Sequence, residues 1–244
     1  MKIIDSIKRL KWYEALIWIS SVILILISFL ISGAGSNLTM IASLIGVTAL
    51  IFVAKGDVLG QILTVIFSVF YGIVSWKFHY WGEMITYLGM TAPIAAGAVI
   101  TWMKNPFQKG EVRVKPTTPG LWLKLLALSM VVTFAFFILL KSFKTPNLLF
   151  STLSVTTSFL AASLTLFRSA YYGLLYAAND VVLIILWILA TIEEPSYLSM
   201  VICFICFFVN DLYGFINWKR IRSRQNNQSS EESSSVSSSS TEKS

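Results

Sequence analysis

The stretches AYYGLLYAANDVVLIILWILATI (residues 170–192) and YLSMVICFICFFVNDLYGFINW (residues 197–218) decide the fold of this chain. Each has about the ~20 residues that a helix needs to cross a lipid bilayer. Each also carries an Asn-Asp pair in its interior, Asn179-Asp180 in the first and Asn210-Asp211 in the second. A carboxylate at hydrocarbon depth costs roughly a few kcal/mol, so it usually faces a cavity or a partner. The pattern therefore predicts two membrane helices whose polar pairs face the interior of the protein.

Aromatic and polar residues recur at helical intervals around both pairs, so that each helix has one face of this kind. The face consists of Tyr172, Tyr176, Asn179, Asp180, Leu183 and Trp187 in the first stretch, and of Phe207, Asn210, Asp211, Gly214 and Trp218 in the second. Inside a membrane such a face could enclose a flat polar molecule. The alternative is that these polar groups hydrogen-bond one helix to another, which is a common packing use in membranes.

The composition of the whole chain is that of a membrane protein. Of its 244 residues, 56% are hydrophobic and 13% are charged, and the mean hydropathy is +0.73. Soluble domains carry about 25% charged residues. The net charge of +7 does not indicate nucleic-acid binding, because the basic residues lie at the ends of apolar runs. That placement is typical of membrane orientation.

Eight apolar segments follow one another along the chain, and each is long enough to span a bilayer. They cover roughly 13–33, 38–54, 58–77, 82–103, 121–140, 147–167, 170–192 and 198–218. If the N-terminus is cytoplasmic, the inner segments hold fourteen basic residues and the outer loops hold three. This asymmetry predicts that both termini are cytoplasmic.

A weak internal repeat divides the membrane part into two similar blocks. Lys55 and Gly60 match Arg168 and Gly173, and the segment 87–90 matches the segment 197–200. The predicted all-α organisation is one leading helix followed by three, one and three helices, with the two three-helix bundles parallel. Its parts are a basic N-terminus with the leading helix (1–33), a first bundle (38–103), a cytoplasmic loop with a linking helix (104–146) and a second bundle (147–218). Parallel repeats occur in known transporters, which bind substrate near the midplane between the halves.

The last part of the chain, 219–244, has no apolar run and consists mostly of Ser, Asn, Gln and Glu. Such a segment cannot bury enough surface to offset the entropy of ordering. We therefore expect a disordered cytoplasmic tail.

The motifs around the two Asn-Asp pairs resemble those of the PnuC family of bacterial vitamin transporters. The resemblance covers about 38–218 and rests on the helix from Gly173 to Trp187 with Asn179 at its centre, on the run Asn210-Asp211-Leu212-Tyr213-Gly214, and on Asn217-Trp218 before a basic stop. It implies a SWEET-like fold, a homotrimer in the bacterial inner membrane, and import of nicotinamide riboside by facilitated diffusion with alternating access. It also implies that amides on the last two helices hold the substrate, which points to Asn179 and Asn210.

The residues expected to bind a small-molecule substrate are Asn179, Asn210, Tyr176, Trp187, Tyr213, Gln61, Asp180, Asp211 and Tyr172. Gln61 comes from the 58–77 helix, where Thr64, Ser68, Tyr71 and Ser75 share its face. That face either completes the site or packs through its hydroxyl groups. Aromatic rings and amides would orient a heteroaromatic ring and a ribose.

Two other functions remain open at the level of the sequence. One is proton-coupled transport of another vitamin or nucleoside, such as thiamine, riboflavin or a deoxyribonucleoside, with Asp180 or Asp211 titrating. The other is an intramembrane enzyme that uses these two carboxylates as acid and base. No nucleophile motif or metal-ligand set accompanies them, and Cys203 and Cys206 have no second pair for a zinc site. We therefore expect no enzyme activity, metal or cofactor.

Overall fold

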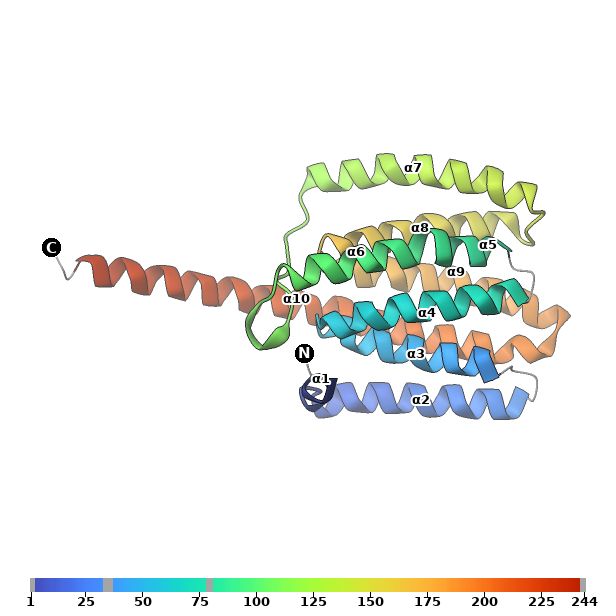
Figure 1. The fold of residues 1–244 in the computed structure, drawn as a ribbon, viewed down its shortest axis with the longest axis horizontal. Helices are drawn as coiled ribbons and strands as arrows, with labels where there is room; N and C mark the ends of the chain where they lie inside the picture. The colour runs from blue at the N-terminus through green and yellow to red at the C-terminus, as the bar shows by residue number, and fades with distance from the viewer. Residues whose placement is uncertain (1–2, 33–36, 78–80, 242–244) are drawn as a thin grey trace.

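The computed structural model describes residues 3–32, 37–77 and 81–241, which form a bundle of long helices lying side by side (Figure 1). The elements are α1 (Ile3–Lys8), α2 (Trp12–Ser32), α3 (Asn37–Ala54), α4 (Val58–Lys77), α5 (Trp81–Thr86), the π-helical turn η1 (Tyr87–Thr91), α6 (Ala92–Met103), η2 (Gln108–Gly110), α7 (Pro119–Ser142), α8 (Leu148–Leu166), α9 (Tyr172–Glu193), η3 (Pro195–Tyr197) and α10 (Leu198–Thr241). Within the described ranges, eight helical segments are long and apolar enough to cross a membrane. The predicted all-α membrane fold is confirmed.

The helices pack in an order that places α2 and α7 at opposite edges of the bundle (Figure 1). α2 packs on α3 and α10, and α7 packs on α8. Between these edges, α3 and α4 pack together with α6, and α8 and α9 pack together with α10. Contacts of α10 with α3 and of α6 with α8 join the two groups. The finer arrangement of three, one and three helices in parallel halves stays a prediction.

The fourth membrane segment is one helical rod made of three pieces, α5, η1 and α6. Pro93, at the start of α6, has no backbone N–H and cannot bond the carbonyl one turn earlier. The widened π turn of η1 lies directly before it, at a position where such bulges relieve a break in the helical hydrogen bonds. The local change of register turns Tyr87 and Thr91 toward the centre of the bundle, where both are buried.

One end of the bundle, here called the basic end, is formed by the α3–α4 turn, the α8–α9 turn and the segment 104–118. The two turns have the same hydrogen-bond pattern. Gly56 and Arg168 both have positive φ, and the next residue in each turn, Asp57 or Ser169, uses its side chain to accept a backbone N–H two residues later. Backbone N–H groups of segment 104–118 bond both turns, since Val112 donates to the Gly56 carbonyl and Lys115 donates to the Arg168 carbonyl, each at 2.9 Å. By this pattern Arg168 occupies the position in its turn that Gly56 occupies in the other. The sequence repeat instead matches Arg168 with Lys55, one residue earlier.

Crossed hydrogen bonds join the two helix groups at the basic end. Trp102 of α6 donates through Nε1 to the Thr165 carbonyl of α8 at 3.0 Å, and Trp218 of α10 donates to the Val53 carbonyl of α3 at 2.9 Å. The two indole rings lie 5.3 Å apart between centroids, and both are fully buried.

Two more side chains, one from each helix group, repeat this crossing next to the tryptophans. Thr101 donates to the Leu166 carbonyl at 3.2 Å, and Asn217 donates to the Ala54 carbonyl at 2.9 Å. Together with the tryptophan bonds, these four contacts close the bundle at the basic end.

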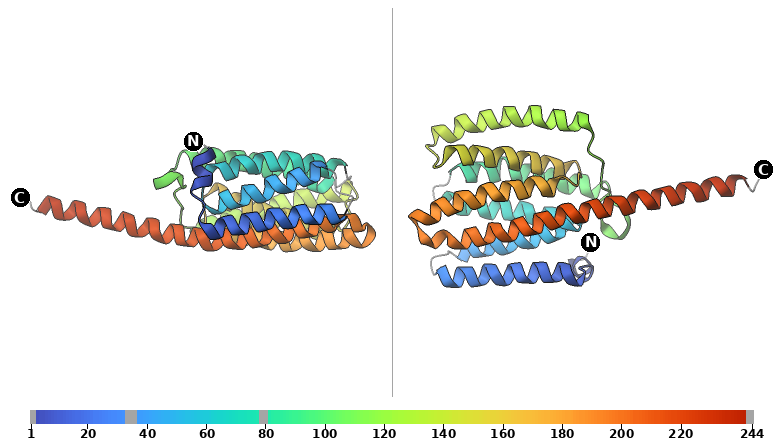
Figure 2. Two further views of the ribbon diagram at one scale, coloured as in Figure 1. Left: turned by 90° about the horizontal axis from the view of Figure 1, so that it is seen from below. Right: turned by 180° about the vertical axis from the view of Figure 1, so that it is seen from behind.

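α10 continues as a helix through Thr241 and projects from the basic end (Figures 1 and 2), although the composition from residue 219 onward favours disorder. The disordered tail stays a prediction. The transmembrane part of α10 already provides the costly helix nucleus, and each further residue then adds one hydrogen bond. Gln225 also anchors the extension, since its amide donates to the Val112 carbonyl at 3.0 Å and accepts from the Val114 N–H at 2.9 Å. Composition alone does not reveal these contacts with segment 104–118.

Candidate functional site

A cavity of about 50 Å³ lies in the centre of the bundle, among α3, α4, η1, α9 and α10. Its polar lining comes from Gln61, Thr64, Thr91, Asn179, Asp180 and Asp211, and its aromatic lining from Phe67, Tyr87, Tyr176, Phe204 and Phe207. The structure therefore brings together Gln61, Tyr176, Asn179, Asp180 and Asp211 of the predicted site residues.

Asn179 is held in place by α8. Its side-chain carbonyl accepts hydrogen bonds from Ser154 Oγ at 3.1 Å and from Thr157 Oγ1 at 2.9 Å. Both lone pairs of that oxygen are thereby used, and the NH₂ group is the part of the amide that remains for a ligand. Asn179 is 3% exposed, so its position is set by packing before any ligand arrives.

Asp180 and Asp211 face each other from α9 and α10. Their carboxyl groups are within hydrogen-bonding contact, and such a bond needs a proton on one of the two groups. The second oxygen of Asp180, Oδ2, is buried and has no hydrogen-bond partner among the described residues. Each aspartate thus has the other aspartate as its partner, and within the described part of the chain neither bonds the neighbouring asparagine.

The α4 face that was expected to contribute to the site does so only in part. Gln61 and Thr64 line the cavity, while Ser68 donates to the Thr64 carbonyl of its own helix at 2.8 Å. Tyr71 lies above the cavity with its ring 4.4 Å from that of Tyr87. Hydroxyl groups that bond their own helix serve packing, so both expected uses of this face occur on one helix.

Asn210 and Tyr213 lie outside the central cavity, on the side of α10 that packs against α2. The Asn210 amide donates to Ser21 Oγ at 3.2 Å and to the Cys206 carbonyl at 2.8 Å. The Tyr213 hydroxyl donates to Glu14 Oε1 at 2.6 Å. Asn210 thus makes the helix-to-helix contact that the sequence left open as an alternative.

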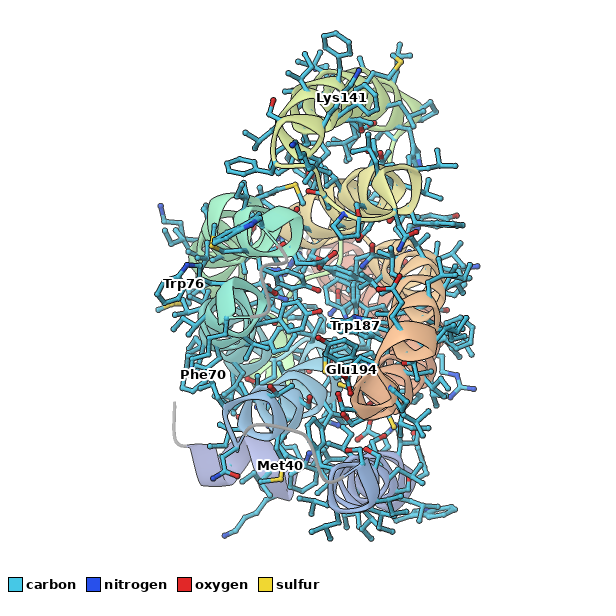
Figure 3. The ribbon with its side chains drawn as sticks, turned by 90° about the vertical axis from the view of Figure 1, so that its right-hand side faces the viewer. Met40, Phe70, Trp76, Lys141, Trp187 and Glu194 are labelled. Atoms are coloured by element: carbon cyan, nitrogen blue, oxygen red, sulfur yellow. The ribbon has the colours of Figure 1, made fainter. Side chains whose placement is uncertain are left out.

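Tyr172 and Trp187 lie on opposite sides of the cavity along the length of the bundle. Tyr172 is buried near the basic end, with its ring 4.8 Å from Trp218. Trp187 lies toward the opposite end, here called the far end, which is formed by the α7–α8 and α9–α10 connections. Figure 3 looks onto the far end and shows Trp187 near the middle, between the helices.

Several residues that line the cavity were not expected from the sequence. Tyr87 and Thr91 point inward because η1 changes the helical register, and Pro93 was the only signal of that change. Phe67 and Phe204 are single aromatic residues within apolar runs, where sequence alone does not separate a cavity lining from ordinary packing. Among the described residues, no group of three His, Cys, Asp or Glu is placed to hold a metal ion.

Comparison with known proteins gives one family and several relatives. The family model described as nicotinamide mononucleotide transporter matches residues 36–220. The nicotinamide riboside transporter PnuC of Neisseria mucosa is 25% identical over 199 residues, which cover 79% of this chain and 76% of the relative. The protein of the same name from Haemophilus influenzae is 25% identical over 213 residues, which cover 86% and 91%. A crystal structure of the vitamin B3 transporter PnuC has a similar fold, with a TM-score of 0.77 at 24% identity over 88% of this chain and 94% of that one.

Proposed function

The chain belongs to the nicotinamide mononucleotide transporter family, and from this premise we propose that it carries nicotinamide riboside across a membrane. The curated relatives are named nicotinamide riboside transporters, whereas the family description names the phosphorylated compound. The two ligands differ by one phosphate group, so the charge of the central cavity distinguishes them.

The lining of the central cavity favours nicotinamide riboside over nicotinamide mononucleotide. It includes two carboxyl groups, Asp180 and Asp211, and among the described residues no Lys or Arg lines it. Phosphate sites usually contain Lys or Arg, and ionised aspartates repel a phosphate. Nicotinamide riboside is a cation, since its pyridine nitrogen is bonded to the ribose. A cationic ring next to a pair of carboxyl groups is electrostatically favoured.

The remaining polar groups suit a carboxamide and a ribose. The Asn179 NH₂ group donates to a carbonyl or hydroxyl oxygen, and the Gln61 amide offers both a donor and an acceptor. The Tyr176 ring provides a flat surface for stacking on the pyridinium ring. Binding sites for molecules of this size usually measure about 300–1,000 Å³, so the cavity of about 50 Å³ must widen when the substrate enters.

Widening of this kind fits alternating access between two helix groups, with transport by facilitated diffusion. The matched turns at Gly56 and Arg168, and the crossed bonds of Trp102 and Trp218, support two related halves in the order one, three, one, three. Parallel halves that rock around a midplane site occur in known transporters. A homotrimer, as the resemblance to the PnuC family implies, is part of this proposal.

The proposed location is the bacterial inner membrane, with the basic end toward the cytoplasm. The basic end carries Lys55, Arg113, Lys115, Arg168 and Lys219 near the helix ends, in agreement with the positive-inside rule.

Proton-coupled transport is a second candidate, because two carboxyl groups that can take up and release a proton, those of Asp180 and Asp211, line the same cavity. Proteoliposomes separate the two mechanisms. Under facilitated diffusion, labelled nicotinamide riboside equilibrates without a pH or sodium gradient and never exceeds the outside concentration. Accumulation above that concentration, driven by an imposed proton gradient, would establish coupling instead.

The substrate itself is tested by calorimetric titration of the purified protein with nicotinamide riboside, nicotinamide mononucleotide, thiamine, riboflavin and deoxyribonucleosides. We expect saturable binding of the riboside and none of the mononucleotide. Tight binding of the mononucleotide, or binding of another compound in place of the riboside, would overturn the assignment.

A further inference from the structure

A second cavity, of about 80 Å³, opens at the far end of the bundle. It lies between α5, the α7–α8 connection, the start of α8 and the last turns of α9. The polar part of its lining consists of Glu83, Glu193, Thr145, Asn147 and Ser151, and the Trp187 ring is its aromatic wall. Two carboxylates, two hydroxyls and an amide thus converge beside one indole.

Two of these polar groups have buried atoms without a hydrogen-bond partner in the described part of the chain. They are Glu83 Oε2 and Thr145 Oγ1. A buried carboxylate oxygen without a partner is costly, and a cation or a donor that enters the cavity would offset this cost. The cavity therefore offers a cation or a hydrogen-bond donor two polar atoms that have no partner within the described part of the chain.

A layer of aromatic side chains separates this cavity from the central one. Trp187 borders the far-end cavity, Tyr87 and Phe204 border the central cavity, and all three belong to one packed cluster that also contains Tyr71. The Tyr71 and Tyr87 rings are 4.4 Å apart. A molecule that moves from one cavity to the other must displace this layer.

We propose that the far-end cavity is an outer binding site for nicotinamide riboside, where Glu83 binds the positively charged pyridinium ring before the substrate passes the aromatic layer. The proposal rests on the proposed function, which supplies a cationic substrate. The Trp187 indole adds a cation–π contact to the positively charged ring. Thr145, Asn147 and Ser151 offer hydrogen bonds to the ribose hydroxyls.

The test is the association rate of the purified full-length protein, followed by stopped-flow tryptophan fluorescence. Glu83→Gln keeps the size of the side chain and removes its charge. We expect it to slow association of nicotinamide riboside about tenfold at low salt, within the range over which charges steer ligands. The reduced, dihydro form of the riboside is uncharged, and its rate should not change. Glu194→Gln is the matched control, because Glu194 is exposed at the same end and does not line the cavity.

Equal rates for the wild type and Glu83→Gln would overturn the outer site, and so would an equal loss for the charged and uncharged forms. Raising the ionic strength tests the wild type directly, because association of the cation should slow while that of the dihydro form stays constant.

Asn179→Ala separates the two cavities. The fast phase of the fluorescence change, which reports binding at the far-end cavity, should persist, although final binding in the central cavity is weaker. If the wild type transports the riboside but shows no charge dependence, only the outer site is wrong. If it neither binds nor transports the riboside, the proposed function itself is wrong.

Discussion

The two asparagines of the Asn-Asp pairs differ in what surrounds their amide groups. Asn179 uses its carbonyl for Ser154 and Thr157 of α8 and lines the central cavity. Asn210 uses its NH₂ group for Ser21 and for a carbonyl of its own helix, away from that cavity. The same residue type therefore has two different expected roles.

Replacement of each asparagine by alanine tests these roles. Asn179→Ala should weaken binding of nicotinamide riboside by about five- to 150-fold, since a lost hydrogen bond to a buried group costs about 1–3 kcal/mol. It should also lower the melting temperature, because Ser154 and Thr157 lose their acceptor. Asn210→Ala should lower the melting temperature and leave affinity within about twofold.

Calorimetric titration and a melting curve on the same samples check both variants. If Asn179→Ala keeps its affinity and only melts earlier, Asn179 belongs to the scaffold. A large loss of affinity in Asn210→Ala would assign the amide of α10 a role in the site.

At the scale of the helices, the approach of α9 to α10 depends on Gly173. A Cβ atom at this position would lie 2.6 Å from the Asp211 carbonyl oxygen and 2.7 Å from the Phe215 nitrogen. Both are backbone atoms, so no side chain can rotate away, and the helices would have to separate next to the carboxyl pair. Gly60 allows another close approach, that of α4 to α3, where a Cβ atom would lie 2.3 Å from the Val53 nitrogen.

Gly173→Ala should therefore destabilise the protein by about 1–3 kcal/mol or more, which is the usual cost of overpacking. It should also weaken riboside binding, because Asp211 moves with α10. Gly120→Ala in α7 is the matched control, since a Cβ atom there has nothing within 4 Å. We expect the control to melt at or slightly above the wild-type temperature. Equal melting temperatures for the two variants would contradict the close contact.

The helices could be predicted from the sequence because an apolar run of sufficient length is a local property. The direction of Asn210 could not, because α10 packs against α2, α3 and α9, and periodicity does not tell which neighbour a polar residue meets. Asp211, one residue later, does reach the cavity. The inward turn of Tyr87 and Thr91 depends on η1, and the start of the α10 extension depends on Gln225 contacting a loop more than a hundred residues earlier. Such contacts between distant segments leave no periodic pattern.

At the scale of the whole molecule, the orientation of the bundle decides which cavity meets the outside. Single cysteines at Ser142 and Pro195 lie at the far end, and at Gln108 and Ser229 they lie at the basic end; all four positions are exposed. In intact cells we expect a membrane-impermeant thiol reagent to label the first two and not the second two. Permeabilised cells are the control, because all four should then react. Labelling of Ser229→Cys in intact cells would reverse the proposed orientation.

If the basic end opens during transport, as the proposed alternating access requires, the crossed bonds of Trp102, Thr101, Trp218 and Asn217 oppose that opening in the empty protein. Each bond is worth about 0.5–1.5 kcal/mol net, so the four together favour closure by roughly 2–6 kcal/mol. At that difference, an opening is populated in about one molecule in thirty at the weak limit and one in tens of thousands at the strong limit. Because each helix group holds the backbone of the other, separation breaks all four bonds at nearly the same moment. Under the proposed mechanism, the binding energy of the substrate therefore has to offset the loss of these bonds before the basic end is open in a large fraction of molecules.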